Sequence, residues 1–395
     1  MATCQKLNRY YAAVALVCIV FAVPVAYTFF DAARVSTLCT AILLIVYGSF
    51  RSLLLERDEA NKRADASENS QDDLSLFQTF DATQALFFPL GASVSLLIMF
   101  FFFDSLQTVF ALGSAVIATL AMAFLLQPMC QYLVRPFCDK HEIDLWLCGA
   151  YPVDHVLSFL IAFVLVCLWV LTGHWLLMDA LSMGLAVAFI ALVRLPSLKV
   201  STILLLGLLV YDIFWVFFSA HLFSTNVMVN VATKTVDNPL NTAARKLGLT
   251  GIFVKNGPKL SLPAKLAFPS SESAGKFSFL GVGDIVMPGL LLCFVLRFDA
   301  HRKRRHSDSG ENASDFWLYQ NMGYFYCSLL GYCIGLITAT VAAELSRAAQ
   351  PALLYLVPFT LLPLCVMAYA KGDLRRMWHE PFANLTVRRL NDVVV

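Results

Sequence analysis

Long, uninterrupted stretches of apolar residues recur along almost the whole chain. A helix rises 1.5 Å per residue, so it needs about 20 apolar residues to cross a bilayer core about 30 Å thick. Nine stretches reach this length, and a tenth at 10–30 suits either a signal-like segment or an extra span. We favour the extra span, because no small-residue cleavage site follows it. The nine predicted spans are 35–55, 84–103, 106–128, 154–173, 175–193, 200–220, 277–297, 316–340 and 348–370.

The stretches are continuously apolar, whereas the strands of a membrane barrel alternate polar and apolar residues, so we predict helices. The composition agrees: 59% of the 395 residues are apolar and 14% are charged. The predicted fold is an all-α polytopic membrane protein with nine helices and no separate soluble domain. Its expected parts are an N-terminal segment 1–34, a bundle 35–199 with spans one to five, a region 200–370 that contains the long connection 221–276, and a tail 371–395.

Lysine and arginine gather in alternate short loops, which predicts the orientation of the spans. Basic residues follow spans one, three, five, seven and nine, most densely in the run Arg302-Lys303-Arg304-Arg305. The loops 104–105 and 173–174 contain none. We therefore expect the C-terminus in the cytosol and the connection 221–276 in the lumen.

Two acidic residues interrupt apolar spans far from their ends, namely Asp212 in span six and Asp284 in span seven. A charged carboxylate at the bilayer centre costs at least about 2.5 kcal/mol, so such a residue lines a cavity, finds a partner or stays protonated. With span seven starting at 277, both carboxylates lie about 20 Å from the cytosolic side. Other acidic residues, such as Asp179, stand near span ends, where we expect water to reach them.

Two carboxyl groups at one depth on packed spans would share a single proton at neutral pH. Such a pair can hydrolyse an amide, because one group takes a proton from water while the other protonates the carbonyl oxygen. Gly281 and Gly283 remove side chains from the approach to Asp284. Proton-coupled transporters also use carboxylates in the membrane, and the residue chemistry alone leaves that alternative open.

Three short motifs separate these alternatives. Tyr211-Asp212, Gly281-Val282-Gly283-Asp284 and Pro351-Ala352-Leu353 resemble the YD, GxGD and PAL motifs of the signal peptide peptidase and presenilin group of intramembrane aspartyl proteases. The strings YDIFWVF and QPALLYLVP resemble signal peptide peptidase in particular. The resemblance covers most of the chain, and the three motifs appear in order, each in its expected span.

The resemblance implies a fold and an activity. The fold is a nine-helix bundle of the presenilin and signal peptide peptidase type. The activity is endopeptidase cleavage of membrane helices by Asp212 and Asp284, most of all remnant signal peptides and type II membrane segments. Site residues that position the substrate would be Tyr211, Gly281, Gly283, Pro351, Ala352 and Leu353.

Expected partners are helical peptide substrates and membrane lipid, with no nucleic acid, and a homo-oligomer remains open. We expect no cofactor and no metal, since the sequence has no HExxH motif or clustered His and Cys set. Localisation to the endoplasmic reticulum membrane rests on the resemblance, because the terminal NDVVV carries no retrieval signal.

Overall fold

A computed structural model describes residues 32–65, 77–134, 142–145, 149–223, 225–234, 260–269, 277–308, 323–346, 350–379 and 381–382. The apolar stretch 10–30 and residues 235–259 of the long connection lie outside this part of the chain. The chain forms two compact units. The first comprises 1–96, 189–229 and 283–395, and the second comprises 97–188 and 230–282.

Within the described residues, eight helical segments are long and apolar enough to cross a membrane. A further helix, α10 (Val282–Asp308), supplies the remaining predicted span. The chain is thus a polytopic all-α membrane protein, as its apolar pattern predicts. The eight segments are Ala32–Glu59, Ala82–Phe103, Ser105–Val134, Val153–Thr172, Trp175–Leu192, Leu198–Phe223, Tyr324–Ser346 and Leu353–Ala370.

Spans two and three belong to one continuous helix, α3 (Ala82–Val134). The pattern predicts a break at Asp104-Ser105, and helical hydrogen bonding instead runs through both residues. Asp and Ser lower helix propensity only slightly, whereas Gly and Pro, the strong helix breakers, are absent at this point. A polar pair between two apolar runs therefore marks the limit of a span without ending the helix.

The start of span seven is a strand rather than a helix, which corrects the predicted boundary at 277. Strand β6 (Phe277–Gly281) pairs antiparallel with β5 (Lys265–Pro269), and α10 begins only at Val282. An apolar stretch can satisfy its backbone as a strand once a partner strand is present. Asp284 consequently lies in the first turn of α10, so its predicted depth, counted from residue 277, does not hold.

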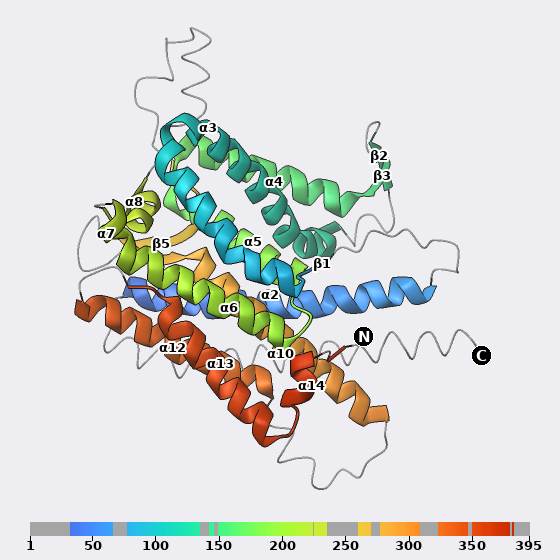
Figure 1. Ribbon diagram of the computed structural model, residues 1–395. Helices are drawn as coiled ribbons and strands as arrows, with labels where there is room; N and C mark the ends of the chain where they lie inside the picture. The colour runs from blue at the N-terminus through green and yellow to red at the C-terminus, as the bar shows by residue number, and fades with distance from the viewer. Residues whose placement is uncertain are drawn as a thin grey trace. The chain divides into compact units, whose positions relative to one another are not determined.

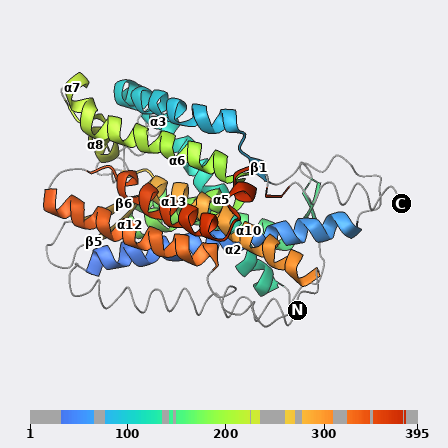
Figure 2. The ribbon, with the colours of Figure 1, turned by 60° about the horizontal axis from the view of Figure 1, so that its bottom comes forward.

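The first unit is built around α12 (Tyr324–Ser346) and α13 (Leu353–Ala370), which lie side by side in Figures 1 and 2. Close approach requires glycine on α12: a Cβ at Gly331 would collide with the Phe359 carbonyl, and one at Gly335 would lie 3.2 Å from the Leu356 Cα. Small residues at such positions let membrane helices pack closely.

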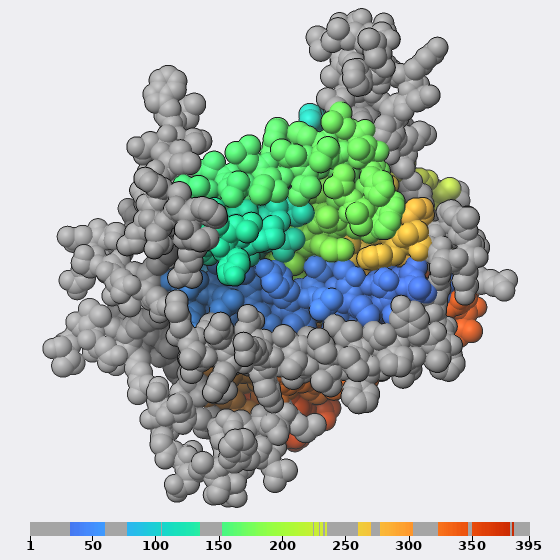
Figure 3. Space-filling view, turned by 180° about the vertical axis from the view of Figure 1, so that it is seen from behind, coloured from blue at the N-terminus to red at the C-terminus, as the bar shows by residue number. Residues whose placement is uncertain are grey.

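Three further helices contact this pair. Helix α6 (Leu198–Ile213) and the short α14 (Leu374–His379) contact α13 and each other, and α2 (Ala32–Asp65) contacts α12. Part of α2 is visible as a band of surface atoms in Figure 3. Its exposed apolar side chains, which include Leu43 and Tyr47, suit contact with lipid.

A cluster of charged and aromatic side chains surrounds the second half of α10. Arg297 donates from Nε to Glu56 Oε2 at 2.9 Å, and His301 lies 3.4 Å from the other carboxylate oxygen. The Phe382 ring lies 4.7 Å from the Arg297 guanidinium and 4.9 Å from the His301 ring. We call Glu56, Arg297, His301 and Phe382 the α10 polar cluster.

Arg194 stands close to this cluster, at the end of β4 (Val193–Arg194), which pairs in parallel with β1 (Gln78–Thr79). Its guanidinium lies 2.9 Å from the centroid of the Phe77 ring. Burial and the nearby Arg297 lower the pKa of Arg194 to about 10. The guanidinium is therefore still charged at neutral pH.

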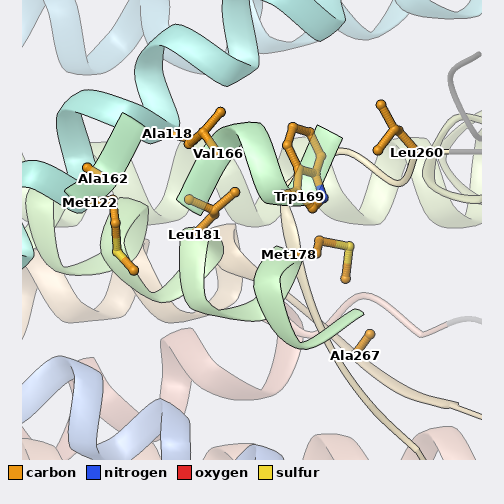
Figure 4. Close-up of a cluster of buried hydrophobic side chains, with 9 residues drawn as sticks. All are labelled: Ala118, Met122, Ala162, Val166, Trp169, Met178, Leu181, Leu260 and Ala267. Carbon is orange, nitrogen blue, oxygen red and sulfur yellow. The ribbon is translucent and has the colours of Figure 1, made fainter. Parts of the chain in front are cut away.

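The second unit has its own apolar core, shown in Figure 4, where side chains from α3, α4 (Val153–Thr172) and α5 (Trp175–Leu192) meet residues of the segment 260–269. Trp169, 1% exposed, is the largest member of this core. The unit also contains the hairpin of β2 (Glu142–Leu145) and β3 (Gly149–Pro152). The core comprises Ala118, Met122, Ala162, Val166, Trp169, Met178, Leu181, Leu260 and Ala267.

Candidate active site

Asp212 lies near the end of α6, on a helix whose start is well defined. Ser197 caps the N-terminus, because its Oγ accepts a hydrogen bond from the Val200 N–H at 3.3 Å. The apolar residues that follow bury one side of the helix, and Asp212 itself is only 3% exposed. Bilayer and protein thus exclude water from most of its surroundings.

A π-helical turn, η1 (Phe214–Phe218), follows directly after α6. The Ser219 N–H donates to the Phe214 carbonyl five residues back, which is the π-helical bond. Asn226 donates from Nδ2 to the Val216 carbonyl at 3.2 Å, and the Ser219 hydroxyl donates to the Trp215 carbonyl at 2.6 Å. Side chains therefore satisfy carbonyls in this irregular turn, which continues as α7 (Ser219–Phe223) and, after a bend, α8 (Val227–Thr233).

Asp284 is in the first turn of α10 and is partly exposed. Gly283 beside it is exposed, and a Cβ added there would meet no atom within 4 Å. Gly281, the third residue of this motif, ends strand β6 and lies outside the helix. The motif therefore joins a strand to a helix, with open space next to its carboxylate.

The Pro351-Ala352-Leu353 turn contacts Asp212 directly. Helix α13 starts at Leu353, whose N–H has no acceptor within the helix and donates to Asp212 Oδ2 at 3.2 Å. The positive end of the helix dipole favours a carboxylate at this position. Pro351 suits the turn before the helix because it has no N–H to satisfy. Two of the three motifs thus meet through a single hydrogen bond.

The two aspartates are also close enough to interact. The Asp284 carboxyl experiences the charge of Asp212 electrostatically. Tyr211, the neighbour of Asp212, is half-buried, and its ring centroid lies 6.5 Å from that of Trp215. Trp215 in turn donates from Nε1 to the Ser93 hydroxyl at 3.1 Å. The structure therefore places Tyr211 against an aromatic neighbour and brings Asp212, Asp284 and Leu353 together.

Tyr332 on α12 is a residue that the sequence analysis misses. It is fully buried and lies within electrostatic range of Asp284. Its hydroxyl has no hydrogen-bond partner among the described residues. A buried hydroxyl without a partner is costly, which makes it a candidate donor to a group that binds beside Asp284. No motif marks this residue, since it is one tyrosine in a long apolar run.

Asp179, expected near water close to the start of span five, is instead 1% exposed. Its Oδ1 accepts a hydrogen bond from the Ala267 N–H of β5 at 2.8 Å. Position along a span does not reveal burial against another segment, and here the strand β5 covers the carboxylate. Among the described residues, no group of three or more His, Cys, Asp or Glu side chains is placed to hold a metal ion.

Known proteins resemble this chain over most of its length. The signal peptide peptidase family matches residues 72–384, which include all three motifs. Signal peptide peptidase-like 1 of Oryza sativa subsp. japonica is 37% identical over 358 residues, covering 88% of this chain and 93% of the relative. Signal peptide peptidase-like 1 of Arabidopsis thaliana is 34% identical over 381 residues, covering 92% and 97%. The chain therefore belongs to the signal peptide peptidase family, and it is a multi-pass intramembrane protease.

Proposed function

We propose that this protease is of the aspartyl type and that Asp212 and Asp284 together hydrolyse peptide bonds of membrane-spanning helices. The observation that carries the proposal is the contact of Asp212 with the Leu353 N–H at 3.2 Å, while Asp284 lies within electrostatic range of the same carboxylate. Two carboxyl groups in a low-dielectric site hold one proton between them, which is the state that acid and base catalysis requires.

The reaction proceeds by general acid and base catalysis. The charged carboxylate takes a proton from water, and the resulting hydroxide attacks the amide carbonyl carbon. The neutral carboxyl protonates the carbonyl oxygen, so the product of this step is an uncharged tetrahedral diol. The carboxyl that took the water proton then gives it to the amide nitrogen, while the other carboxylate, now charged, takes a proton from a diol hydroxyl. The C–N bond breaks, which yields a carboxylic acid and an amine. The Leu353 N–H holds Asp212 in position throughout.

The expected substrates are single membrane helices, above all remnant signal peptides and type II membrane segments. Their carbonyls are hydrogen-bonded within the helix, so a segment must unwind before water can attack it. Residues that weaken a helix should therefore promote cleavage. Gly281, Gly283, Tyr211 and the Pro351-Ala352 turn would position the unwound segment, since open space at Gly283 adjoins Asp284.

The orientation and location belong to the same proposal. The basic loops favour a cytosolic C-terminus and a lumenal connection 221–276. The endoplasmic reticulum membrane is where remnant signal peptides arise. Substrate would thus enter from the lipid of that membrane with its N-terminus toward the cytosol.

The proposal is tested with purified protein in lipid vesicles and a labelled signal-peptide helix. The wild type should release two fragments, and Asp212→Asn and Asp284→Asn should each release neither. Asp81→Asn, which changes an exposed carboxyl outside the site, is the matched control and should cleave normally. Proton flux that depends on Asp212, in vesicles where no peptide is cleaved, would replace the protease with a transporter.

A further inference from the structure

The hairpin of β5 and β6 leads directly into the turn that carries Asp284. Lys265 pairs with Gly281 and Ala267 with Phe279. The Val282 N–H, at the first residue of α10, donates to the Ala264 carbonyl at 3.0 Å. The last hydrogen bond of the hairpin therefore holds the residue two positions before Asp284.

This hydrogen bond also shows which edge of β5 faces away from β6. Backbone groups in an antiparallel pair point alternately toward the partner strand and away from it. Because Ala264 bonds across the hairpin, the backbone N–H and C=O groups of Lys265 and Ala267 point to the outer edge of β5. An outer edge in an apolar environment must find other partners.

Two polar side chains of α5 supply these partners. Asp179 Oδ1 accepts the Ala267 N–H at 2.8 Å. The Ser182 hydroxyl shares its proton between the Lys265 carbonyl at 3.0 Å and the Met178 carbonyl of its own helix at 2.9 Å. Asp179 and Ser182 are separated by three residues, which places them on one face of the helix. Both are buried, at 1% and 0% exposure. One acceptor and one donor on α5 thus match one donor and one acceptor on β5.

The choice of an aspartate for this contact is costly. A carboxylate in a membrane span is unfavourable, and the second oxygen of Asp179 is buried without a hydrogen-bond partner among the described residues. Simple packing of a strand on a helix would not require such a group. The cost is explained if the position of the strand itself matters to the reaction.

We propose that Asp179 and Ser182 are positioning residues, which hold β5 by its outer edge so that the hairpin presents the Gly281-Val282-Gly283 segment and Asp284 in one fixed geometry. This inference rests on the proposed function, because it links the hydrogen bonds of Asp179 and Ser182 with β5 to the reaction of Asp284. Neither residue touches the reacting atoms. Their effect reaches the site along the chain, from β5 through β6 into the first turn of α10.

The test compares variants that keep or remove the acceptor on α5. Asp179→Asn retains an oxygen at Oδ1, so it should cleave within about threefold of the wild type. Asp179→Ala removes the acceptor and should lower kcat at least about tenfold with little change in KM. Ser182→Ala should have a smaller effect in the same direction. Ser201→Ala is the matched control, because Ser201 is equally buried and its hydroxyl bonds only within its own helix.

A change on the strand removes the same hydrogen bond from the other side. Ala267→Pro has no N–H to donate, and it costs no bond to β6 because that N–H points outward. Its kcat should fall as much as that of Asp179→Ala, and the double variant should be no worse than either single. Hydrogen exchange at Ala267 should be slow in the wild type and Asp179→Asn and fast in Asp179→Ala.

Several outcomes would overturn the inference. Full kcat in Asp179→Ala, additive losses in the double variant, or loss of cleavage in Asp179→Asn at an unchanged unfolding temperature would each do so. If Asp179→Ala fails to fold, Ala267→Pro and Ser182→Ala provide the test. A normal kcat in both would show that the contacts of Asp179 and Ser182 with β5 do not position the site. Failure of the proposed function looks different, because then the wild type itself cleaves nothing or Asp284→Asn remains active.

Discussion

The first turn and the second half of α10 differ in whether their charged side chains have partners. In its second half, Arg297 is paired with Glu56 at 2.9 Å, and Asp299 accepts the Phe325 N–H at 2.9 Å. In its first turn, Asp284 has no hydrogen-bond or ion-pair partner among the described residues and stands next to open space at Gly283. We call the second half of α10, with Arg297 and Asp299, its satisfied end, and the first turn, with Asp284, its unsatisfied end.

The difference separates charges that support the structure from those available for chemistry. A paired buried charge contributes to the fold, and its loss leaves a partner unsatisfied. An unpaired carboxylate in a partly closed site keeps its proton-binding capacity free for a substrate. Changes at the satisfied end should therefore affect folding, and changes at the unsatisfied end should affect turnover.

The largest expected effect is at the unsatisfied end. Asp284→Asn should lower cleavage by at least about 10³-fold, and the double variant with Asp212→Asn should be no worse, because the two groups act as one unit. The unfolding temperature in detergent should stay within a few degrees of the wild type. An additional loss in the double variant would mean that the aspartates act independently.

Removing a carboxylate from the satisfied end should give the reverse pattern. Glu56→Gln leaves the buried Arg297 guanidinium without a counter-charge, and we expect a loss of about 1–3 kcal/mol in stability, reduced from the fully buried case because Glu56 is partly exposed. The folded fraction should cleave at the normal rate. Glu344→Gln, which breaks an exposed pair with Arg34, is the control and should change stability by less than about 1 kcal/mol.

Tyr332→Phe sharpens the comparison, because it removes only a hydroxyl within electrostatic range of Asp284. The hydroxyl has no partner in the described structure, so its loss should leave stability unchanged or slightly higher. If it donates to the tetrahedral diol, kcat should fall about tenfold, while KM stays constant. A purely structural tyrosine would show normal kcat in the folded protein.

The smallest expected effect is at Gly283. An alanine Cβ there meets no atom within 4 Å, so Gly283→Ala should leave the unfolding temperature unchanged. It should lower cleavage a few-fold, because the methyl group occupies space beside Asp284. By contrast, Gly331→Ala places a Cβ against the Phe359 carbonyl and should destabilise the pair α12 and α13. Equal losses of stability in both would remove the distinction between open and packed glycines.

Much of this architecture can be predicted from sequence, because hydropathy is a local property. The apolar runs locate the spans, and the order of the three motifs predicts which spans bear Asp212, Asp284 and Leu353. Strand β6 is missed because Phe277–Gly281 is apolar and adjoins a helix, so that only its pairing with β5 distinguishes it. That pairing is a contact between segments, and the hydropathy of one segment does not depend on it.

The same limit explains the two misjudged polar residues. Asp179 stands near a span end, where water is the default partner, and its burial depends on β5. Tyr332 has no charge and no motif, so only its surroundings reveal an unsatisfied hydroxyl. Both become visible once the donor and acceptor of each buried group are traced.

The π-helical turn after Asp212 has a consequence for how this segment tolerates change in chain length. A π turn accommodates one residue more than an α turn over about the same rise, so η1 takes up one extra residue without rotating the helical residues beyond it. Deleting one residue after Trp215 within η1 would therefore convert it to a regular α turn and leave Ser219 close to the Trp215 carbonyl and Asn226, whereas a second deletion would rotate Ser219 by about 100° away from them. Asp212, which precedes the turn, would keep its own phase. The span should thus tolerate the loss of one residue within these five positions but not of two, and neither change alters where its carboxylate points.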